Sequence, residues 1–511
     1  MLKITDHNRK WWVLLAMSCA LALVFIDQTA ISVVLVTIQR ELSANSTDIH
    51  WVINAYLLTL SAVILLGGSM GDAIGHKRMF LFGITLFAFA SALCGFAYNS
   101  TELILARVLQ GIGGAFMMPC ASALVVNNFS DNERGKAMGI YVGIAAIFLA
   151  VGPLLGGVLT QWISWRAIFW INVPISLISI LLTAHVLPPM KAMRAFNLDT
   201  LGFLLSAACM ISIVLYFMEA PTWGWISMRS LCLILTILIS IAAFILWEHS
   251  RTTPLIDLKL FKNTIFTSIL SITFIGQAVG TVFIFWSIFL QIILHYSVVD
   301  TGFLLLPFTI PLMIIAPIAG RLRDRYGPRI APLCGTVLGV CGFILVGSSS
   351  HLQNYHGLFP GFLLCGIAMP MILSGSIATG LSAVSEQQRA TASAIINCVR
   401  QLGISIGLAI LSGLLNSLND WKLTQLLKHG QDLTLSQLNA EQIDGLLSGS
   451  ASALKIVARL TVQESKQVIS AATAAYNFAF SKTMYIAASF TLLIFVCILK
   501  LPKHFNNKIE K

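Results

Sequence analysis

The chain has 511 residues, 57% of them hydrophobic and only 10% charged, and its mean hydropathy is +0.85. A soluble domain carries about 25% charged residues, so the composition excludes a protein that is surrounded by water on all sides. The formal charge of +11 does not indicate nucleic-acid binding, because the Lys and Arg residues occur in short groups between apolar runs and form no basic face.

Fourteen runs are long and apolar enough to span a bilayer, which takes about 20 mostly apolar residues. The first continues from Trp11 to Ile38 without a cleavage pattern and is therefore an uncleaved span, not a signal peptide. The ninth is long enough to be tilted or partly interfacial. The predicted spans are 11–37, 50–70, 79–98, 102–126, 136–160, 167–188, 198–219, 228–248, 264–294, 302–320, 329–348, 357–380, 390–415 and 483–501.

The distribution of Lys and Arg predicts the orientation of these spans. Most of the 32 basic residues fall in the two terminal segments and in alternate connections, whereas the short connections on the other side hold few. Because basic loops stay in the cytoplasm, both termini are predicted to be cytoplasmic, in a multi-pass protein of the inner membrane. Residues 416–482 are predicted to form an outer loop with short amphipathic helices.

A loop motif occurs twice in the chain. The pattern G-x-x-x-D-x-x-G follows the second span at Gly68–Gly75 and the tenth span at Gly320–Gly327, and basic residues follow both copies. The copies are eight spans apart, which predicts two six-helix halves with two further helices between them. The expected domains are residues 1–190, the inserted helices 191–262, and residues 263–511.

Four further motifs lie inside the spans. They are Asp27-Gln28-Thr29 in the first span; Leu103, Arg107, Gln110, Gly111, Gly113 and Gly114 in the fourth; Gly139, Gly152, Pro153, Gly156 and Gly157 in the fifth; and Arg400-Gln401-Leu402-Gly403 in the thirteenth. With them the chain resembles the major facilitator superfamily, specifically its fourteen-helix drug:proton antiporter branch (EmrB/QacA-like). Ala73 and Phe148 depart from the usual loop and fifth-span patterns.

The resemblance covers nearly the whole chain and implies a major facilitator fold and a secondary active transporter. It implies proton-coupled export of drugs or other amphipathic molecules, without a cofactor. In Gram-negative relatives it also implies a periplasmic adaptor and an outer-membrane channel. Two alternatives stay open: an exporter of one endogenous metabolite, such as a siderophore or lipid-like compound, and a membrane sensor built on a transporter fold.

Asp27 and Arg107 are the candidates for proton coupling, because ionisable groups inside a membrane are costly and usually functional. Counted at 1.5 Å per residue, both lie in the outer half of the bilayer at similar depth. We expect them to interact directly or through water, so that a change in their distance would load or unload a proton. The alternative is a fixed structural ion pair.

Eight side chains are candidates for the substrate cavity. Glu219 could instead be an interfacial charge, and Arg400 could instead bind a helix-end carbonyl. Packing roles are the alternative for Gln277, Gln291, Trp286 and Asn397. An acidic cavity would suit lipophilic cations and Arg400 would suit anions, and the sequence leaves this choice open. The candidates are Gln28, Gln110, Glu219, Gln277, Trp286, Gln291, Asn397 and Arg400.

The repeated loop motif is predicted to be a conformational gate, because a carboxylate there can cap a helix and pair with Arg in the outward-facing state. The gate residues are Gly68, Asp72, Gly75, Lys77, Arg78, Gly320, Asp324, Arg325, Gly327 and Arg329. The fifth-span residues Gly139, Gly152, Pro153, Gly156 and Gly157 are predicted to allow close helix contact and a bend.

Other classes of protein lack support in the sequence. No phosphate-binding loop G-x-x-x-x-G-K-[ST] indicates an ATP-driven pump. The ten Cys lie in apolar runs without C-x-x-C spacing, and the His residues form no H-E-x-x-H pattern, so neither a metal site nor an enzyme is predicted.

Overall fold

The computed structural model describes residues 6–187, 199–251, 258–384, 389–429 and 462–502, which form α-helices and two short 3-10 helices without a β-strand. Thirteen helices in these ranges are long and apolar enough to cross a membrane. They coincide with thirteen of the predicted spans, and α5 (Asp131–Trp162) lies at the remaining one, 136–160. The expectation of an all-α membrane protein is therefore confirmed.

The helices before residue 187 form the N-terminal bundle, in which α1 contacts α4, α5 and α7, while α4 packs between α2 and α3. Asn45 and Asn99 begin α2 and α4 by accepting a backbone hydrogen bond with their side chains, as N-cap residues do. The remaining bounds are α1 (Asp6–Glu41), α2 (Ser46–Ile74), α3 (His76–Phe96), α4 (Ser100–Asn127), α6 (Ala167–Trp170) and α7 (Asn172–Val186).

The helices after residue 258 form the C-terminal bundle, in which α15 packs against α10, α13 and α14, and α16 lies between α10 and α19. It consists of η1 (Leu258–Lys262), α10 (Thr264–Gly280), α11 (Val282–Ile292), α12 (Val298–Leu304), α13 (Leu306–Tyr326), α14 (Ile330–Ser349), η2 (Ser350–Leu352), α15 (Tyr355–Ser382), α16 (Arg389–His429) and α19 (Val462–Leu499).

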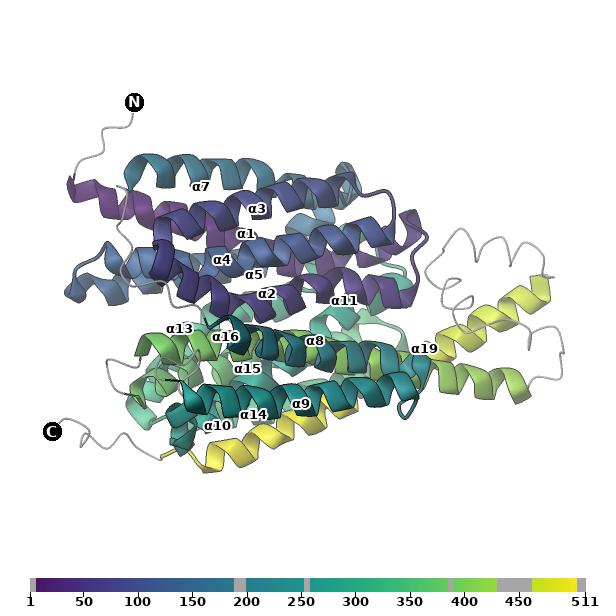
Figure 1. Ribbon diagram of the computed structural model, residues 1–511. Helices are drawn as coiled ribbons and strands as arrows, with labels where there is room; N and C mark the ends of the chain where they lie inside the picture. Colours follow the sequence, from purple (N-terminus) through teal and green to yellow (C-terminus); the bar gives the residue numbers. More distant parts are fainter. Residues whose placement is uncertain (1–5, 188–198, 252–257, 385–388, 430–461, 503–511) are drawn as a thin grey trace.

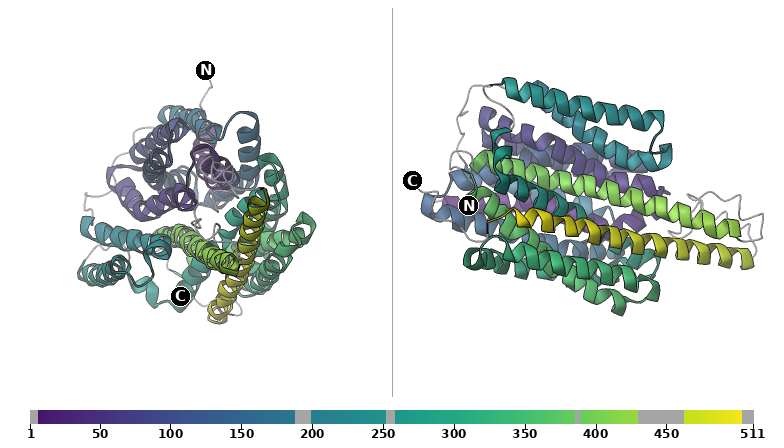
Figure 2. Two further views of the ribbon diagram at one scale, coloured as in Figure 1. Left: turned by 90° about the vertical axis from the view of Figure 1, so that its right-hand side faces the viewer. Right: turned by 90° about the horizontal axis from the view of Figure 1, so that it is seen from below.

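Two helices, α8 (Thr200–Trp223) and α9 (Met228–Ser250), lie at one edge of the molecule (Figure 2). Helix α8 contacts α9, and it also contacts α2 of the N-terminal bundle and α16 of the C-terminal bundle. Helix α9 leaves large apolar side chains such as Leu235 and Leu246 exposed, which fits a surface that faces lipid. The domain boundaries near 190 and 262 stay predictions, because residues 188–198 and 252–257 lie outside the described ranges.

Helix α1 begins and α19 ends on the same side of the molecule, which we call the terminal face (Figure 1). The other side is called the opposite face. Beyond it, α16 and α19 continue past the other helices as two long rods (Figures 1 and 2). Residues 416–429 and 462–482 therefore belong to these helices.

The helices extend beyond the predicted bounds of spans 13 and 14, at 415 and 483. The chain continues in α16 to His429 and begins α19 at Val462. Apolar residues persist on the inner side of this stretch, where Leu415 and Leu423 are buried, so the polar residues between them mark one exposed helix face rather than a loop. The rest of the predicted outer loop, residues 430–461, lies outside the described part of the chain.

The repeated loop motif has the same backbone geometry in both copies. Gly75 joins α2 to α3 with a φ of 106°, and its N–H donates to the carbonyl of Gly71 at 2.9 Å. Gly327 ends α13 with a φ of 89°, and its N–H donates to the carbonyl of Arg323 at 2.8 Å. A side chain is strained at such φ values, so the motif requires glycine at both turns.

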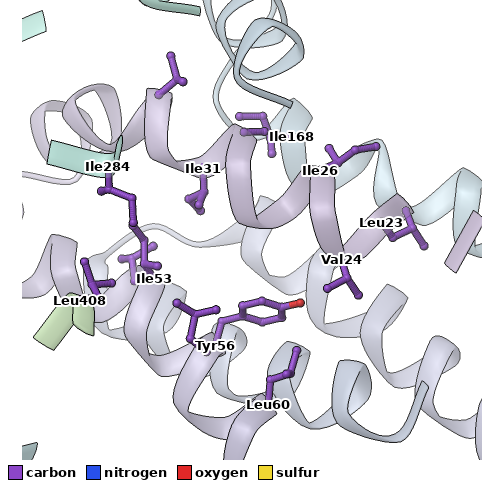
Figure 3. Packing of buried hydrophobic residues seen from close by; sticks show 14 of the residues in the cluster. Leu23, Val24, Ile26, Ile31, Ile53, Tyr56, Leu60, Ile168, Ile284 and Leu408 are labelled. Carbon is purple, nitrogen blue, oxygen red and sulfur yellow. The ribbon is translucent and has the colours of Figure 1, made fainter. Parts of the chain in front are cut away.

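Apolar contacts join the two bundles around α2. Figure 3 shows Ile284 of α11 reaching toward Ile53 of α2, with Leu408 of α16 beside them. Elsewhere glycines bring helices together, because the membrane supplies little hydrophobic drive for helix association. A β-carbon on Gly403 would lie 2.6 Å from the Phe274 carbonyl oxygen. The α16–α10 contact is therefore made close to the backbone.

The substitution Gly407→Ala tests this contact. A β-carbon there would lie 2.3 Å from the Cα of Ala278 in α10, so we expect a loss of about 1–3 kcal/mol in stability from overpacking. The thermal unfolding midpoint of the purified protein measures it. Gly143→Ala in α5 is the control, because its β-carbon meets nothing within 4 Å; equal midpoints for the two variants would contradict the prediction.

Candidate functional site

A central cavity of about 200 Å³ lies between the two bundles. Its walls are mostly apolar and aromatic, with two guanidinium groups and several amides and hydroxyls among them. The N-terminal bundle contributes Phe25, Gln28, Thr29, Ile53, Tyr56, Leu57, Arg107 and Leu149. The C-terminal bundle contributes Gly276, Gln277, Gly280, Thr281, Phe283, Ile284, Phe308, Thr309, Leu312, Met369, Leu373, Arg400, Gln401 and Ile404.

Helix packing directs the polar groups of the C-terminal bundle into this cavity. The predicted ninth span is interrupted at Thr281, between α10 and α11, and Gly280 and Thr281 line the cavity at this break. On α16, Gly403 and Gly407 pack against α10, and Arg400 and Gln401 line the cavity. Broken membrane helices beside a central site are common in transporters.

Arg400 brings a charge into the cavity wall. Its guanidinium lies 5.7 Å from the ring centroid of Phe25 on α1, and its Nε is buried without a hydrogen-bond partner. Among the described residues it makes no ion pair. The amide Nε2 of Gln28 and the amide oxygen of Gln401 are likewise buried without partners. The cavity therefore contains unused donors from both bundles.

The candidate proton-coupling residues are in direct contact. Arg107 of α4 donates through one terminal nitrogen to Asp27 of α1 at 2.5 Å, and both side chains are 0% exposed. The Nε of Arg107 donates to the carbonyl of Val52 at 2.9 Å, and its guanidinium lies 4.3 Å from the ring centroid of Tyr56. The pair is thus sealed within the N-terminal bundle, and Arg107 also borders the cavity.

Gln110 completes the contacts of this pair. Its amide oxygen accepts from Arg107 at 2.7 Å, and its amide nitrogen donates to Asp27 at 3.2 Å. Behind it, Ser91 of α3 accepts a hydrogen bond from Asn172 of α7 at 3.0 Å. Gln110 was expected in the cavity; the structure places it in this network, because it lies one helical turn from Arg107 on the same face of α4.

The remaining candidates lie outside the cavity lining. Trp286 is stacked on Phe362 within the C-terminal bundle, and Gln291 donates to the carbonyl of Val33 at 2.6 Å. Glu219 accepts from the indole of Trp51 at 2.9 Å, which joins α8 to α2. Asn397 lies in α16, one turn before Arg400 and outside the lining.

Three fifth-span glycines lie at helix contacts. A β-carbon on Gly152 or Gly156 would collide with Thr29 or Ala30 of α1, and one on Gly157 would lie 2.7 Å from the carbonyl oxygen of Val298 in α12. Pro153 interrupts the backbone hydrogen bonding of α5 beside them. Gly139 also lies in α5, but its surroundings are outside the described part of the structure.

Basic residues after the two loop motifs bind the last helix of their own bundle. Lys77 donates to the carbonyls of Ala184 and Leu187 at the end of α7. Arg329 donates to the carbonyls of Leu499 and Leu501 at the end of α19. Cations commonly satisfy such C-terminal carbonyls. In each bundle, the loop motif therefore ties the turn after the second span to the end of the sixth span.

Within the described ranges, the structure gives the other gate candidates a position but no contact between the bundles. Arg78 and Arg325 are exposed on the terminal face, and Gly68 and Gly320 lie within α2 and α13. The side chains of Asp72 and Asp324 lie outside the described part of the structure, so the expected carboxylate–arginine contact stays a prediction.

Hydrogen bonds between the bundles gather near the opposite face. Gln291 of α11 binds the Val33 carbonyl, and the N–H of Val299 donates to the Gln161 side chain at 3.3 Å. Deeper in the molecule, Ser405 of α16 donates to Asn54 of α2 at 2.7 Å. On the terminal face, the described bonds of Lys77 and Arg329 stay within one bundle. In this conformation the bundles are therefore joined at the opposite face.

Sequence reasoning missed Tyr56 and Gln401 as cavity residues. Tyr56 lies on the same face of α2 as Ile53 and points toward α1 (Figure 3). Its position in the middle of an apolar span, where a hydroxyl is costly to bury, was a usable signal. Gln401 was noted only as part of its motif, although it adjoins Arg400 in the sequence.

Comparison with known proteins finds relatives over most of the chain. The family model described as Major Facilitator Superfamily matches residues 17–408. The chain is 31% identical over 425 residues to the tetracenomycin C resistance and export protein of Streptomyces glaucescens, covering 80% of this chain and 77% of the relative. It is 32% identical over 412 residues to the puromycin resistance protein pur8 of Streptomyces alboniger, covering 79% and 81%. Multidrug resistance protein Stp of Mycobacterium tuberculosis is 30% identical over 404 residues, with 79% and 75% covered.

Solved structures share the fold. A bacterial homologue of the human lysosomal transporter Spinster, in an inward-facing and unoccupied conformation, aligns with a TM-score of 0.63 over 98% of this chain and 99% of that chain, at 18% identity. An auto-inhibited POT family peptide transporter aligns with a TM-score of 0.62 over 99% of both chains, at 11% identity. At these identities the likeness extends to the fold alone.

Removal of one partner tests the buried ion pair. Arg107→Met leaves the Asp27 carboxylate buried without its cation, and we expect a loss of about 3–5 kcal/mol in stability. The double variant Asp27→Asn with Arg107→Met removes both charges and should recover most of that loss. Unfolding midpoints of the four proteins in the cycle measure the coupling, and additive losses would contradict a direct pair.

Proposed function

Because the chain belongs to the Major Facilitator Superfamily and is a membrane transporter rather than an enzyme, we propose that it exports amphipathic small molecules in exchange for protons. The observation that carries the proposal is the sealed pair of Asp27 and Arg107, whose guanidinium borders the central cavity. Export is supported by the names of the relatives, which describe tetracenomycin C resistance and export in one protein and puromycin resistance in another.

Proton coupling follows from the chemistry of the pair. A protonated Asp27 no longer attracts Arg107, so proton uptake would release a guanidinium that contacts α2 through Val52 and Tyr56. Both residues are enclosed by the N-terminal bundle, and a proton can reach Asp27 only when neighbouring helices part. Proton binding to Asp27 is therefore tied to a change in conformation, and the exchange of protons for substrate requires such a link.

Alternating access is supported by the distribution of contacts between the bundles. The described bonds joining them lie deep in the molecule or near the opposite face, where glycines of α5 and α12 let the backbones approach. In the export cycle these contacts would break, and the two loop motifs on the terminal face would close the cavity at that side. Small-residue contacts suit this exchange, because they separate without leaving unpaired polar groups.

We further propose that the terminal face is cytoplasmic and that the membrane is the inner membrane. The basic residues of the loop motifs, including Lys77, Arg78 and Arg329, lie on this face, as the positive-inside rule requires. With this orientation, the bonds between the bundles near the opposite face would close the cavity toward the outside. A periplasmic adaptor and an outer-membrane channel stay predictions of the resemblance.

The substitution Asp27→Asn tests proton coupling in proteoliposomes. We expect export of rhodamine 123 or fluorescein driven by a pH gradient to fall at least tenfold, because the amide cannot carry a proton. Exchange of the same dye across the membrane without a gradient should persist. Asp300→Asn, at an exposed carboxylate at the start of α12, is the control and should export at the normal rate. Undiminished gradient-driven export by Asp27→Asn would refute the coupling role.

Cross-linking at the opposite face tests alternating access. A short dithiol-reactive reagent joining Gln161→Cys and Val299→Cys, which contact each other across the bundles, should arrest transport of both dyes. The exposed Cys232, Cys334 and Cys341 are first replaced by Ser.

The matched control is the pair Asp48→Cys and Ser100→Cys. These residues contact each other at the same face within the N-terminal bundle, so the same reagent should leave transport intact. Transport that continues with the bundles joined would contradict the proposed movement.

A further inference from the structure

We propose that the central cavity selects substrates that carry acceptor oxygens with negative charge, such as a carboxylate or phenolate, on an aromatic body. The inference rests on the proposed function only in taking this cavity as the route of the substrate. It concerns the charge of the substrate, which neither the fold nor the proton-coupling pair determines.

The charges around the cavity are unbalanced. No Asp or Glu is among the residues that line the cavity in the described part of the structure. Asp27 is 0% exposed and is committed to Arg107 and Gln110, and Glu219 binds Trp51 away from the lining. The acids that would favour a lipophilic cation are thus both engaged elsewhere.

Arg400 leaves a positive charge uncompensated. Arg107 shares its charge with Asp27, whereas the surroundings described for Arg400 offer the ring of Phe25 and, within electrostatic range, Tyr141. Neither neighbour carries a counter-charge at neutral pH. A guanidinium in a low-dielectric wall attracts a substrate anion more strongly than it would in water, and it repels a cation for the same reason.

Unpartnered polar atoms from both bundles line the same cavity as this charge. Nε of Arg400 and Nε2 of Gln28 are buried donors without acceptors, and the Gln401 side chain is 1% exposed with its amide oxygen unpaired. Buried donors that lack a partner are costly, so a ligand oxygen that accepts from Arg400 and Gln28 removes a penalty present in the empty cavity. Because these residues belong to α16 and α1, such a ligand bridges the two bundles.

The rest of the lining suits a ring system. Phe25, Phe283 and Phe308 come from three different helices, and Met369 and Leu373 add flexible apolar surface. Aromatic walls bind flat rings by stacking and edge contacts. The cavity therefore combines an apolar body site with one charged corner, as small-molecule sites with a few placed polar groups generally do.

Two dyes with the same xanthene core test the proposal. Fluorescein is anionic and rhodamine 123 is cationic near neutral pH. Fluorescence polarisation with the purified full chain at fixed pH should give a Kd for fluorescein at least tenfold below that for rhodamine 123. Arg400→Met should weaken fluorescein binding at least tenfold and leave rhodamine 123 unchanged or tighter. Gln28→Leu should weaken fluorescein binding by a smaller factor.

Two further variants separate recognition from folding. Arg400→Lys keeps the charge and should keep part of the preference for fluorescein. Arg229→Met removes an exposed arginine beside Trp223, outside the cavity, and should change neither Kd. The proposal is overturned if rhodamine 123 binds as tightly as fluorescein to the unmodified chain, or if Arg400→Met binds fluorescein as well as Arg229→Met does.

The outcome is distinguishable from a failure of the proposed function. Binding is measured without a membrane or a gradient, so loss of fluorescein binding in Arg400→Met supports the charge preference even if no gradient drives export. Conversely, gradient-driven export of fluorescein that is indifferent to Arg400→Met retains the antiporter and removes the anion site.

Discussion

The ion pair between Asp27 and Arg107 is the interaction on which the N-terminal bundle depends. Neither charge reaches solvent, and in hydrocarbon neither could persist alone, so α1 and α4 are held at a fixed separation. Gln110 satisfies both partners and Val52 fixes the angle of the guanidinium. The glycines of α4 permit this approach, because a β-carbon on Gly111 would lie 2.6 Å from the Tyr56 carbonyl oxygen. One terminal nitrogen of Arg107 stays without a partner in this network, and in the proposed cycle a proton on Asp27 would loosen the remaining contacts.

The two arginines of the membrane interior differ in their surroundings. Arg107 pairs with Asp27 inside one bundle, and in the proposed cycle its charge would act on the conformation of the protein. Arg400 faces the space between the bundles without a described counter-ion, and in the proposed selection its charge would act on what enters that space. The difference comes from helix packing: α4 turns Arg107 toward α1, whereas α16 places Arg400 in the wall of the cavity between the bundles.

Most of the fold could be predicted because hydrocarbon imposes a length on every apolar run, and the turn glycines Gly75 and Gly327 mark the repeat. Depth counting also brought Asp27 and Arg107 together. The direction in which a side chain points from its helix could not be derived from depth. Trp286 and Gln291 both have a suitable depth, yet Trp286 packs within the C-terminal bundle and Gln291 donates a hydrogen bond to α1. The ends of α16 and α19 were misplaced because a half-exposed helix outside the hydrocarbon resembles a loop in composition. The break at Thr281 left no Pro or charge to reveal it.

Helix α8 touches α2 through Trp51 and Glu219, and α16 through Met218 and Ser412. If the two bundles rock apart as proposed above, α8 cannot move as one body with both of them, so one of its two contacts has to slip. The contact with α16 buries Val214 and Met218 beside Ile406 and Ala409, whereas the contact with α2 adds an indole–carboxylate hydrogen bond. In that cycle the inserted helices would cover the moving joint on its lipid side.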